Sequence, residues 1–180
     1  MEKDFSKIRI FCATPAAGKS WLADHDSRFV DIDALESKYK HAKDLDISAQ
    51  AIQKEFQGKG IKVIREDHRS WIIDQIPKIL DSGKIILSAN HKHILDFLSE
   101  NKIPFAFVDY DPKYKYIYRK RMEERGNDDN FINRMLEHRE ESHRKHKEDP
   151  SSYGMIELVG DEYISDALWR IFGQPDENKS

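Results

Sequence analysis

The sequence predicts an α/β fold in three layers, with a mainly parallel five-stranded sheet covered by helices on both faces. Short apolar runs rich in β-branched and aromatic residues alternate with amphipathic stretches along almost the whole chain. Such alternation indicates right-handed βαβ units, whose strands are parallel and whose helices cover both faces of the sheet. The length of 180 residues suits one domain, and we expect residues 1–180 to form it.

Five apolar runs are predicted to be strands. Each is continuously apolar over its centre, as in strands that are buried on both faces. The runs are 7–13, 28–33, 84–88, 104–109 and, more weakly, 155–159.

Helical spacing of apolar residues predicts five longer helices. They cover 61–80, 92–100, 113–124, 128–147 and 164–172. Gly83 is expected to follow the end of the first of these helices, and Pro77 to disturb its last turn. Gly126 and Asn127 separate the third helix from the fourth.

Composition excludes several classes of protein. The 30 Lys and Arg residues nearly balance 33 Asp and Glu, so overall charge gives no means of coating nucleic acid, and we expect no nucleic-acid partner. The single cysteine, Cys12, excludes an internal disulfide and suits a reducing cytosol. Apolar runs such as 85–87 are too short to span a bilayer, and the N-terminus lacks the apolar stretch of a signal peptide. We therefore expect a cytoplasmic protein without a membrane partner.

The most informative stretch, Ala13-Thr-Pro-Ala-Ala-Gly-Lys-Ser20, follows the first predicted strand and opens a helix. Gly18, Lys19 and Ser20 match the end of the pattern Gly-x-x-x-x-Gly-Lys-Ser/Thr, while Ala13 replaces its first glycine. In such a loop, backbone N–H groups wrap a phosphate chain, the lysine contacts the β- and γ-phosphates, and the hydroxyl binds Mg²⁺. The alternative is an ordinary strand-to-helix turn with an exposed lysine. On the first interpretation, ATP is bound by Thr14, Pro15, Ala16, Ala17, Gly18, Lys19, Ser20 and Trp21.

This loop resembles that of P-loop kinases of the nucleoside-monophosphate-kinase type, which often reads Gly-x-Pro-Gly-x-Gly-Lys-Ser/Thr. Pro15, Gly18, Lys19 and Ser20 match it, whereas Ala13 and Ala16 replace two glycines. A methyl group at either site restricts φ. The resemblance implies the P-loop NTPase fold, a strand order of 2-3-1-4-5, and ATP with Mg²⁺ as cofactors.

Two carboxylates, Asp31 and Asp33, end the second predicted strand on the same face, where open α/β sheets place ligands. One carboxylate there could hold Mg²⁺-bound water, and the other could take a proton from an acceptor hydroxyl. The pattern is similar to the Phe-x-Asp-x-Asp of shikimate-kinase-like enzymes. The alternative for Asp33 is the N-cap of a following helix.

The third predicted strand carries no Walker B carboxylate, which leaves Asp31 or Asp33 to approach the metal, and we assign Mg²⁺ to Ser20 and Asp33. His91 and His93 lack the further ligands of a zinc site and are interpreted as surface residues.

Residues 113–148 are predicted to form a helical lid rich in arginine. Arg121 and Arg125 lie four apart on one helix face, and Gly126 permits a break before Asp128 caps the next helix, which carries Arg134. Guanidinium groups suit phosphate oxygens, and closure would exclude water. The order of Arg125, Asp128, Asp129 and Arg134 resembles the lid of nucleoside monophosphate kinases, with Arg134 arriving about three residues early. Arg139 and Arg144 are interpreted as parts of a solvated charged helix.

The acceptor is expected to contact the segment between the second and third strands. The predicted substrate-binding residues are Asp31, Asp33, Arg65, Arg69 and Asn90, and the predicted catalytic residues are Lys19, Asp33, Arg121, Arg125 and Arg134. The predicted function is ATP-dependent phosphoryl transfer, with a nucleoside or deoxynucleoside monophosphate as the first acceptor. The alternatives are a small hydroxyl compound, the 5′-hydroxyl of a nucleic acid, or a non-catalytic nucleotide-binding module.

Overall fold

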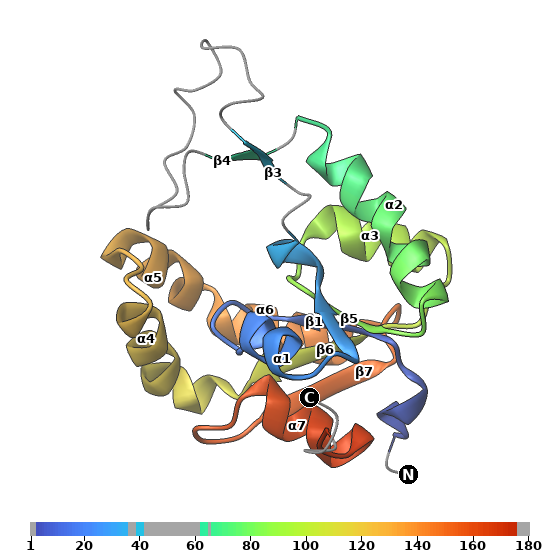
Figure 1. Ribbon diagram of the computed structural model, residues 1–180. Coiled ribbons are helices and arrows are strands. Elements are labelled where there is room, and N and C mark those ends of the chain that lie inside the picture. The colour runs from blue at the N-terminus through green and yellow to red at the C-terminus, as the bar shows by residue number, and fades with distance from the viewer. Residues whose placement is uncertain (1–2, 36–38, 42–61, 65, 176–180) are drawn as a thin grey trace.

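The computed structural model describes residues 3–35, 39–41, 62–64 and 66–175, and its centre is a parallel sheet of five strands (Figure 1). The strands are β1 (Ile10–Ala13), β2 (Phe29–Asp31), β5 (Ile85–Ser88), β6 (Ala106–Tyr110) and β7 (Gly154–Leu158). Their order across the sheet is β2-β5-β1-β6-β7. This confirms both the five predicted strands and their predicted order.

The central strand β1 fixes the register of the sheet. Phe11 lies opposite Leu87 of β5 and Ala106 of β6, and every residue of β1, β5 and β6 is buried. The continuously apolar runs in the sequence therefore correspond to strands that are covered on both faces.

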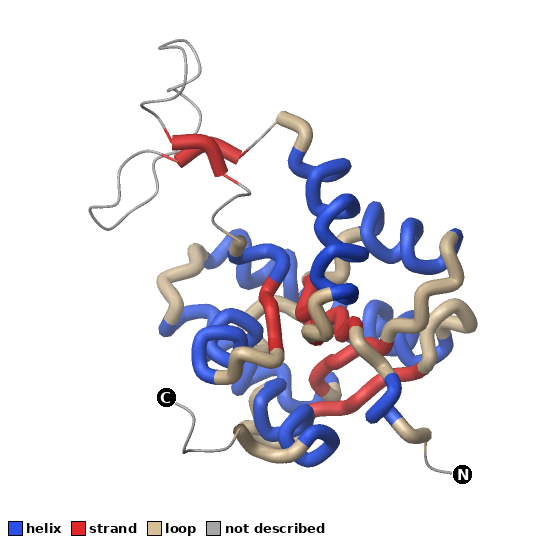
Figure 2. Tube along the Cα trace, turned by 45° about the vertical axis from the view of Figure 1, so that its right-hand side comes forward, coloured by secondary structure: helices blue, strands red, loops and turns tan. Residues whose placement is uncertain are grey.

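Helices cover the two faces of the sheet (Figures 1 and 2). They are α1 (Lys19–His25), α2 (His68–Asp81), α3 (Lys92–Glu100), α4 (Lys115–Glu124), α5 (Asp129–Glu137), α6 (Arg139–Glu148) and α7 (Ile164–Phe172). The predicted bounds of α3 and α7 are confirmed. Among the described residues, no helix has the length and apolar character needed to cross a lipid bilayer.

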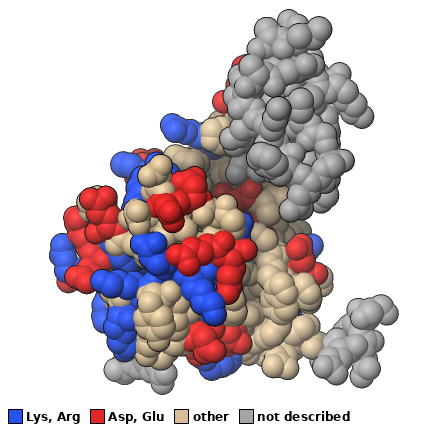
Figure 3. All heavy atoms as spheres, turned by 90° about the vertical axis from the view of Figure 1, so that its left-hand side faces the viewer, with Lys and Arg blue, Asp and Glu red and all other residues tan. Residues whose placement is uncertain are grey.

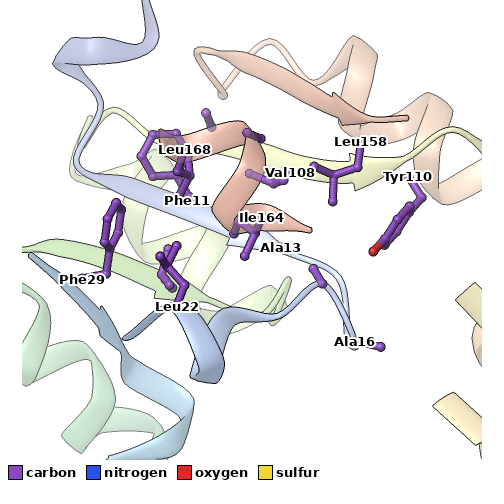
Figure 4. Packing of buried hydrophobic residues seen from close by; sticks show 14 of the residues in the cluster. Phe11, Ala13, Ala16, Leu22, Phe29, Val108, Tyr110, Leu158, Ile164 and Leu168 are labelled. Atoms are coloured by element: carbon purple, nitrogen blue, oxygen red, sulfur yellow. The ribbon is translucent and has the colours of Figure 1, made fainter. Parts of the chain in front are cut away.

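Alternate residues of β1 contribute to two separate apolar cores. Phe11 and Ala13 pack with α1 and α7 residues such as Leu22 and Leu168 (Figure 4). Ile10 and Cys12 pack on the other face, with residues of α2 and α3 that include Ile76. Because side chains of a strand alternate between faces, one short strand holds both helical layers.

The predicted helix over 61–80 is wrong at its N-terminal end. The structure places a strand, β4 (Lys62–Ile64), antiparallel to β3 (Tyr39–His41), and α2 begins only at His68. The Lys-Val-Ile sequence of β4 favours extended backbone, because β-branched side chains fit strands better than helices. The helix then runs through Pro77 to Asp81, and Gly83 follows with a positive φ of 80°.

The single helix predicted over 128–147 is also wrong. Asp128 caps α5 as predicted, with its carboxylate accepting from the Phe131 N–H at 2.9 Å. The helix then breaks at His138, whose φ of −105° and ψ of 20° are not helical, and α6 begins at Arg139.

Helix α6 packs against β6 and β7, and polar side chains form the contacts described below. Arg139 is buried and forms an ion pair with the fully buried Asp109, which corrects the prediction that Arg139 lies on a solvated face. His146 Nδ1 lies 2.8 Å from the other Asp109 oxygen, and His143 Nε2 lies 2.9 Å from Glu157. The three α6 residues are spaced i, i+4 and i+7, so they lie on one face of the helix. Because the chain breaks at His138, α6 takes a different direction from α5 and this face packs on the sheet.

The buried face of α6 predicts a loss of stability in acid. Burial, together with the nearby Arg139 guanidinium, lowers the pKa of His146 from 6.5 to about 4. Neutral His146 therefore stabilises the fold above pH 6.5, and this contribution is lost as the pH falls from 6.5 through 4. We expect it to be about 3 kcal/mol, since tenfold in proton affinity is about 1.4 kcal/mol.

Urea unfolding of the His146→Gln variant between pH 7.5 and 4 measures this effect. The variant should show a shallower fall in the free energy of unfolding than the unmodified chain. His138→Gln, which changes an exposed imidazole, is the control and should keep the full fall. Equal pH dependence in all three proteins would contradict the role of His146.

Candidate functional site

The turn after β1 carries the backbone geometry of an anion-binding loop. Ala13 ends β1, and Gly18 precedes α1 with a left-handed φ of 93°. Ala16 also has a positive φ, 59°, although it carries a Cβ. In the part of the chain that the structure describes, the amides of Ala16 and Gly18 donate no hydrogen bond. These amides, together with the first-turn amides of α1, are available to an anion.

The loop is held from behind by the start of α7. The Ile164 N–H donates to the Ala17 carbonyl at 2.9 Å, and the Tyr163 ring packs against Gly18. A Cβ at position 18 would lie 3.0 Å from Tyr163 Cδ1, so both φ and space require glycine there.

Lys19 extends back over the loop. Its Nζ donates to the carbonyls of Ala13 and Thr14 at 3.3 and 3.4 Å. Burial lowers the pKa of Lys19, and the carboxylates of Asp31 and Asp33 oppose this shift. The ammonium group is therefore at the mouth of the loop, with two carboxylates near it.

Ser20 and Asp31 form the donor set that suits Mg²⁺. The Ser20 hydroxyl donates to Asp31 Oδ2 at 2.7 Å, and Asp31 Oδ1 accepts from the Asp33 N–H at 3.1 Å. Burial raises the pKa of Asp31. A hydroxyl and one carboxylate beside a phosphate loop fit a Mg²⁺ ion that takes its other ligands from phosphate and water. The structure thus joins Ser20 to Asp31, whereas the sequence paired it with Asp33.

Asp33 links the carboxyl ends of β2 and β5. Its Oδ2 accepts from the Ala89 N–H at 2.6 Å, and its Oδ1 lies 3.5 Å from His91 Nε2. Burial alone would raise the pKa of Asp33, but the nearby His91 imidazole and the hydrogen bond from the Ala89 N–H bring it below its usual value. The alternative of a helix N-cap is not observed, since Asp31 caps the short 3₁₀ turn Ile32–Ala34 that contains Asp33.

Beside Asp33 lies an open pocket of about 650 Å³. The pocket lies between the first turns of α2 and α3. Its lining residues are Asp33, His68, Arg69, Ile72, His91, Lys92, His93 and Asp96. Arg69 was predicted to bind substrate and lies in this pocket; Arg65 falls outside the described residues. The prediction that His91 and His93 are plain surface residues misses their shared position in the pocket.

The predicted lid arginines differ in their surroundings. Arg121 is buried, donates to the Tyr110 hydroxyl and to the carbonyls of Asp161 and Glu162, and lies 3.6 Å from the Tyr163 ring centre. Its donors are thus occupied by protein groups, and it supports the loop from behind.

Arg125, at the exposed end of α4, is close enough to Lys19 to lower the pKa of that residue. Arg134 is exposed on α5, with its guanidinium 5.8 Å from the Phe131 ring centre. Of the predicted lid arginines, Arg125 therefore has the position best suited to a bound phosphate chain. On the face that bears α4 and α5, positive and negative side chains are interspersed (Figure 3).

Two further predicted residues have structural partners. The Trp21 ring stacks on His25 with 4.1 Å between ring centres and is 49% exposed. Asn90 Nδ2 lies 3.4 Å from His146 Nε2, which joins the loop after β5 to α6.

Tyr163 and Asp109 were missed by sequence reasoning. The helical spacing of Arg139, His143 and His146 was the readable signal for a polar face opposite Asp109. Tyr163 gave no signal, because its contact with Gly18 spans 145 residues of chain.

Comparison of the sequence with models of known protein families and with curated proteins gives no match. Among the residues that the structure describes, no three His, Cys, Asp or Glu side chains are grouped to hold a metal ion on their own.

The positive φ of Ala16 predicts an unusual tolerance of glycine. An alanine in the left-handed region costs about 1–2 kcal/mol, which offsets what glycine loses in buried methyl and backbone entropy. We expect Ala16→Gly to leave the free energy of unfolding nearly unchanged. Ala17→Gly, the matched control at an equally buried site without positive φ, should lower it by about 1–2 kcal/mol. Equal losses in the two variants, measured by urea unfolding, would contradict the left-handed geometry.

Proposed function

We propose that the protein is an ATP-dependent phosphotransferase. The observation that carries the proposal is the loop between β1 and α1, in which Lys19 reaches back over a turn with left-handed Gly18 and Ser20 contacts Asp31. Backbone amides at a helix N-terminus together with an ammonium group and a hydroxyl are the groups that a Mg²⁺-bound polyphosphate requires.

In this proposal each group of the loop has a separate task. The amides of residues 16–20 bind the phosphate oxygens, and Lys19 stabilises negative charge that develops on the transferred group. Ser20 and Asp31 would hold Mg²⁺, which supplies charge neutralisation between the β- and γ-phosphates. Arg125 is placed to add a second cation from α4, on the side of the loop where its charge already acts on Lys19.

The acceptor is assigned to the pocket beside Asp33. That pocket opens at the same edge of the sheet as the phosphate loop, because the carboxyl ends of parallel strands lie together. The resemblance in the sequence favours a nucleoside monophosphate, and Arg69 offers a cation for its phosphate. The carboxylate of Asp33 favours the second candidate, an acceptor that presents a hydroxyl group.

Replacing Lys19 tests the proposal. Lys19→Met removes the ammonium group that contacts the loop carbonyls of Ala13 and Thr14, so acceptor-dependent ADP release should fall by at least about 100-fold. Lys78→Met, the same change on the exposed face of α2, should stay within about twofold. ATP binding without turnover under any acceptor would instead indicate a nucleotide-binding module.

Asp31→Asn gives a second test with a different readout. Because the amide is a poorer Mg²⁺ ligand than the carboxylate, we expect the Mg²⁺ concentration for half-maximal turnover to rise by about tenfold. An unchanged Mg²⁺ requirement would show that Asp31 is not a Mg²⁺ ligand. It would not bear on the role of Lys19, which the first variant tests separately.

A further inference from the structure

His91 and Asp33 form a pair at the edge of the acceptor pocket. His91 Nε2 lies 3.5 Å from Asp33 Oδ1, and the other carboxylate oxygen is held by the Ala89 N–H at 2.6 Å. Both residues line the pocket, and the His91 side chain is 51% exposed there. One imidazole nitrogen is therefore directed at the carboxylate, and the ring remains accessible from the pocket.

The two members of the pair differ in what they can do with a proton. The Asp33 carboxylate already accepts the Ala89 N–H at 2.6 Å and faces the His91 imidazole with its other oxygen, so it is poorly placed to take a further proton. A carboxylate 3.5 Å from Nε2 favours the imidazole tautomer that carries its proton on Nε2, and in that tautomer Nδ1 is the atom that accepts a proton. The pair thus has the arrangement of a base oriented by an anion.

The charges around the pair are consistent with His91 as the proton acceptor and Asp33 as the group that orients it. His93 stacks on His91 with 5.6 Å between ring centres, and Lys92 pairs with Asp96 at 2.7 Å. His68 and Arg69 face the pocket from α2. Asp33 is the carboxylate in contact with His91, and its negative charge would repel a phosphate dianion placed at the same point.

We infer that the acceptor presents a hydroxyl group to His91, which acts as the general base while Asp33 orients it. This inference rests on the proposed phosphotransferase activity and names its acceptor class. The hydroxyl proton passes to His91 Nδ1, and the hydroxyl oxygen bonds to the γ-phosphorus. The bond between the γ-phosphorus and the bridging oxygen breaks, ADP leaves with that electron pair, and the proton is later released to water. An anionic group elsewhere on the acceptor would find Arg69 in the same pocket.

Turnover with two sets of probes tests the inference. Deoxynucleosides supply hydroxyl acceptors, and the corresponding deoxynucleoside 5′-monophosphates supply phosphate as well. We expect ADP release to rise with hydroxyl acceptors, and His91→Gln to lower it by at least about 100-fold without changing the affinity for a non-hydrolysable ATP analogue. His138→Gln, an exposed histidine outside the pocket, should stay within about twofold. Added imidazole should raise the ADP release rate of the His91→Gly variant by roughly tenfold.

Two results would overturn the inference. One is a His91→Gln variant that keeps wild-type turnover, and the other is product that carries the new phosphate only on an existing phosphate group. Failure of the wild type to bind the ATP analogue would instead reject the proposed function.

The pair itself can be measured without turnover. In ¹⁵N-histidine NMR spectra of the free protein, His91 should be the Nε2-protonated tautomer, and Asp33→Asn should abolish that preference. A tautomer that does not respond to Asp33→Asn would show that the pair does not exist, whatever the result of ATP binding.

Discussion

The hydrogen bond from the Ile164 N–H to the Ala17 carbonyl is the contact on which the site depends. It fixes the middle of a loop whose own amides at Ala16 and Gly18 have no described partner, and the Tyr163 ring packs beside it against Gly18. Arg121 in turn holds Tyr163 by lying over its ring and binding the carbonyls of Asp161 and Glu162. The loop is thus shaped by contacts from outside it, and its free amides and Lys19 remain available for the phosphate chain that we propose it binds.

The parallel sheet supplies the second constraint. Strand β5, beside β1, carries no carboxylate among Ile85–Ser88, but the next strand, β2, ends in Asp31 and leads to Asp33. Asp33 reaches across to the amide of Ala89, just after β5, and Asp31 reaches Ser20. Two carboxylates at the end of β2 and in the turn after it therefore have different partners: Asp31 contacts the Ser20 hydroxyl of the loop, and Asp33 lines the pocket between α2 and α3.

Sequence patterns predicted the elements whose conformation depends on residues close together in the chain. The apolar runs gave the five strands, and apolar spacing gave α3 and α7 with their bounds. The elements that the patterns predicted wrongly depend on contacts between residues far apart in the chain. Ile64 fits the apolar spacing of a helix, but in the structure it pairs with Tyr39 of β3. Arg139 fits a solvated helix face, but the break at His138 places it against Asp109. The loop was found from Gly18, Lys19 and Ser20, whereas Tyr163 and the His91–Asp33 pair arise only in the folded chain.

The central claim is that the backbone amides of residues 16–20 hold a triphosphate. The most direct measurement is the change in ¹H–¹⁵N NMR shifts when a non-hydrolysable ATP analogue is added with Mg²⁺. Large, saturable shifts should centre on the amides of Ala16 to Ser20 and be absent in Lys19→Met at the same analogue concentration. Saturable shifts confined to other parts of the chain, or none at any concentration, would contradict the account.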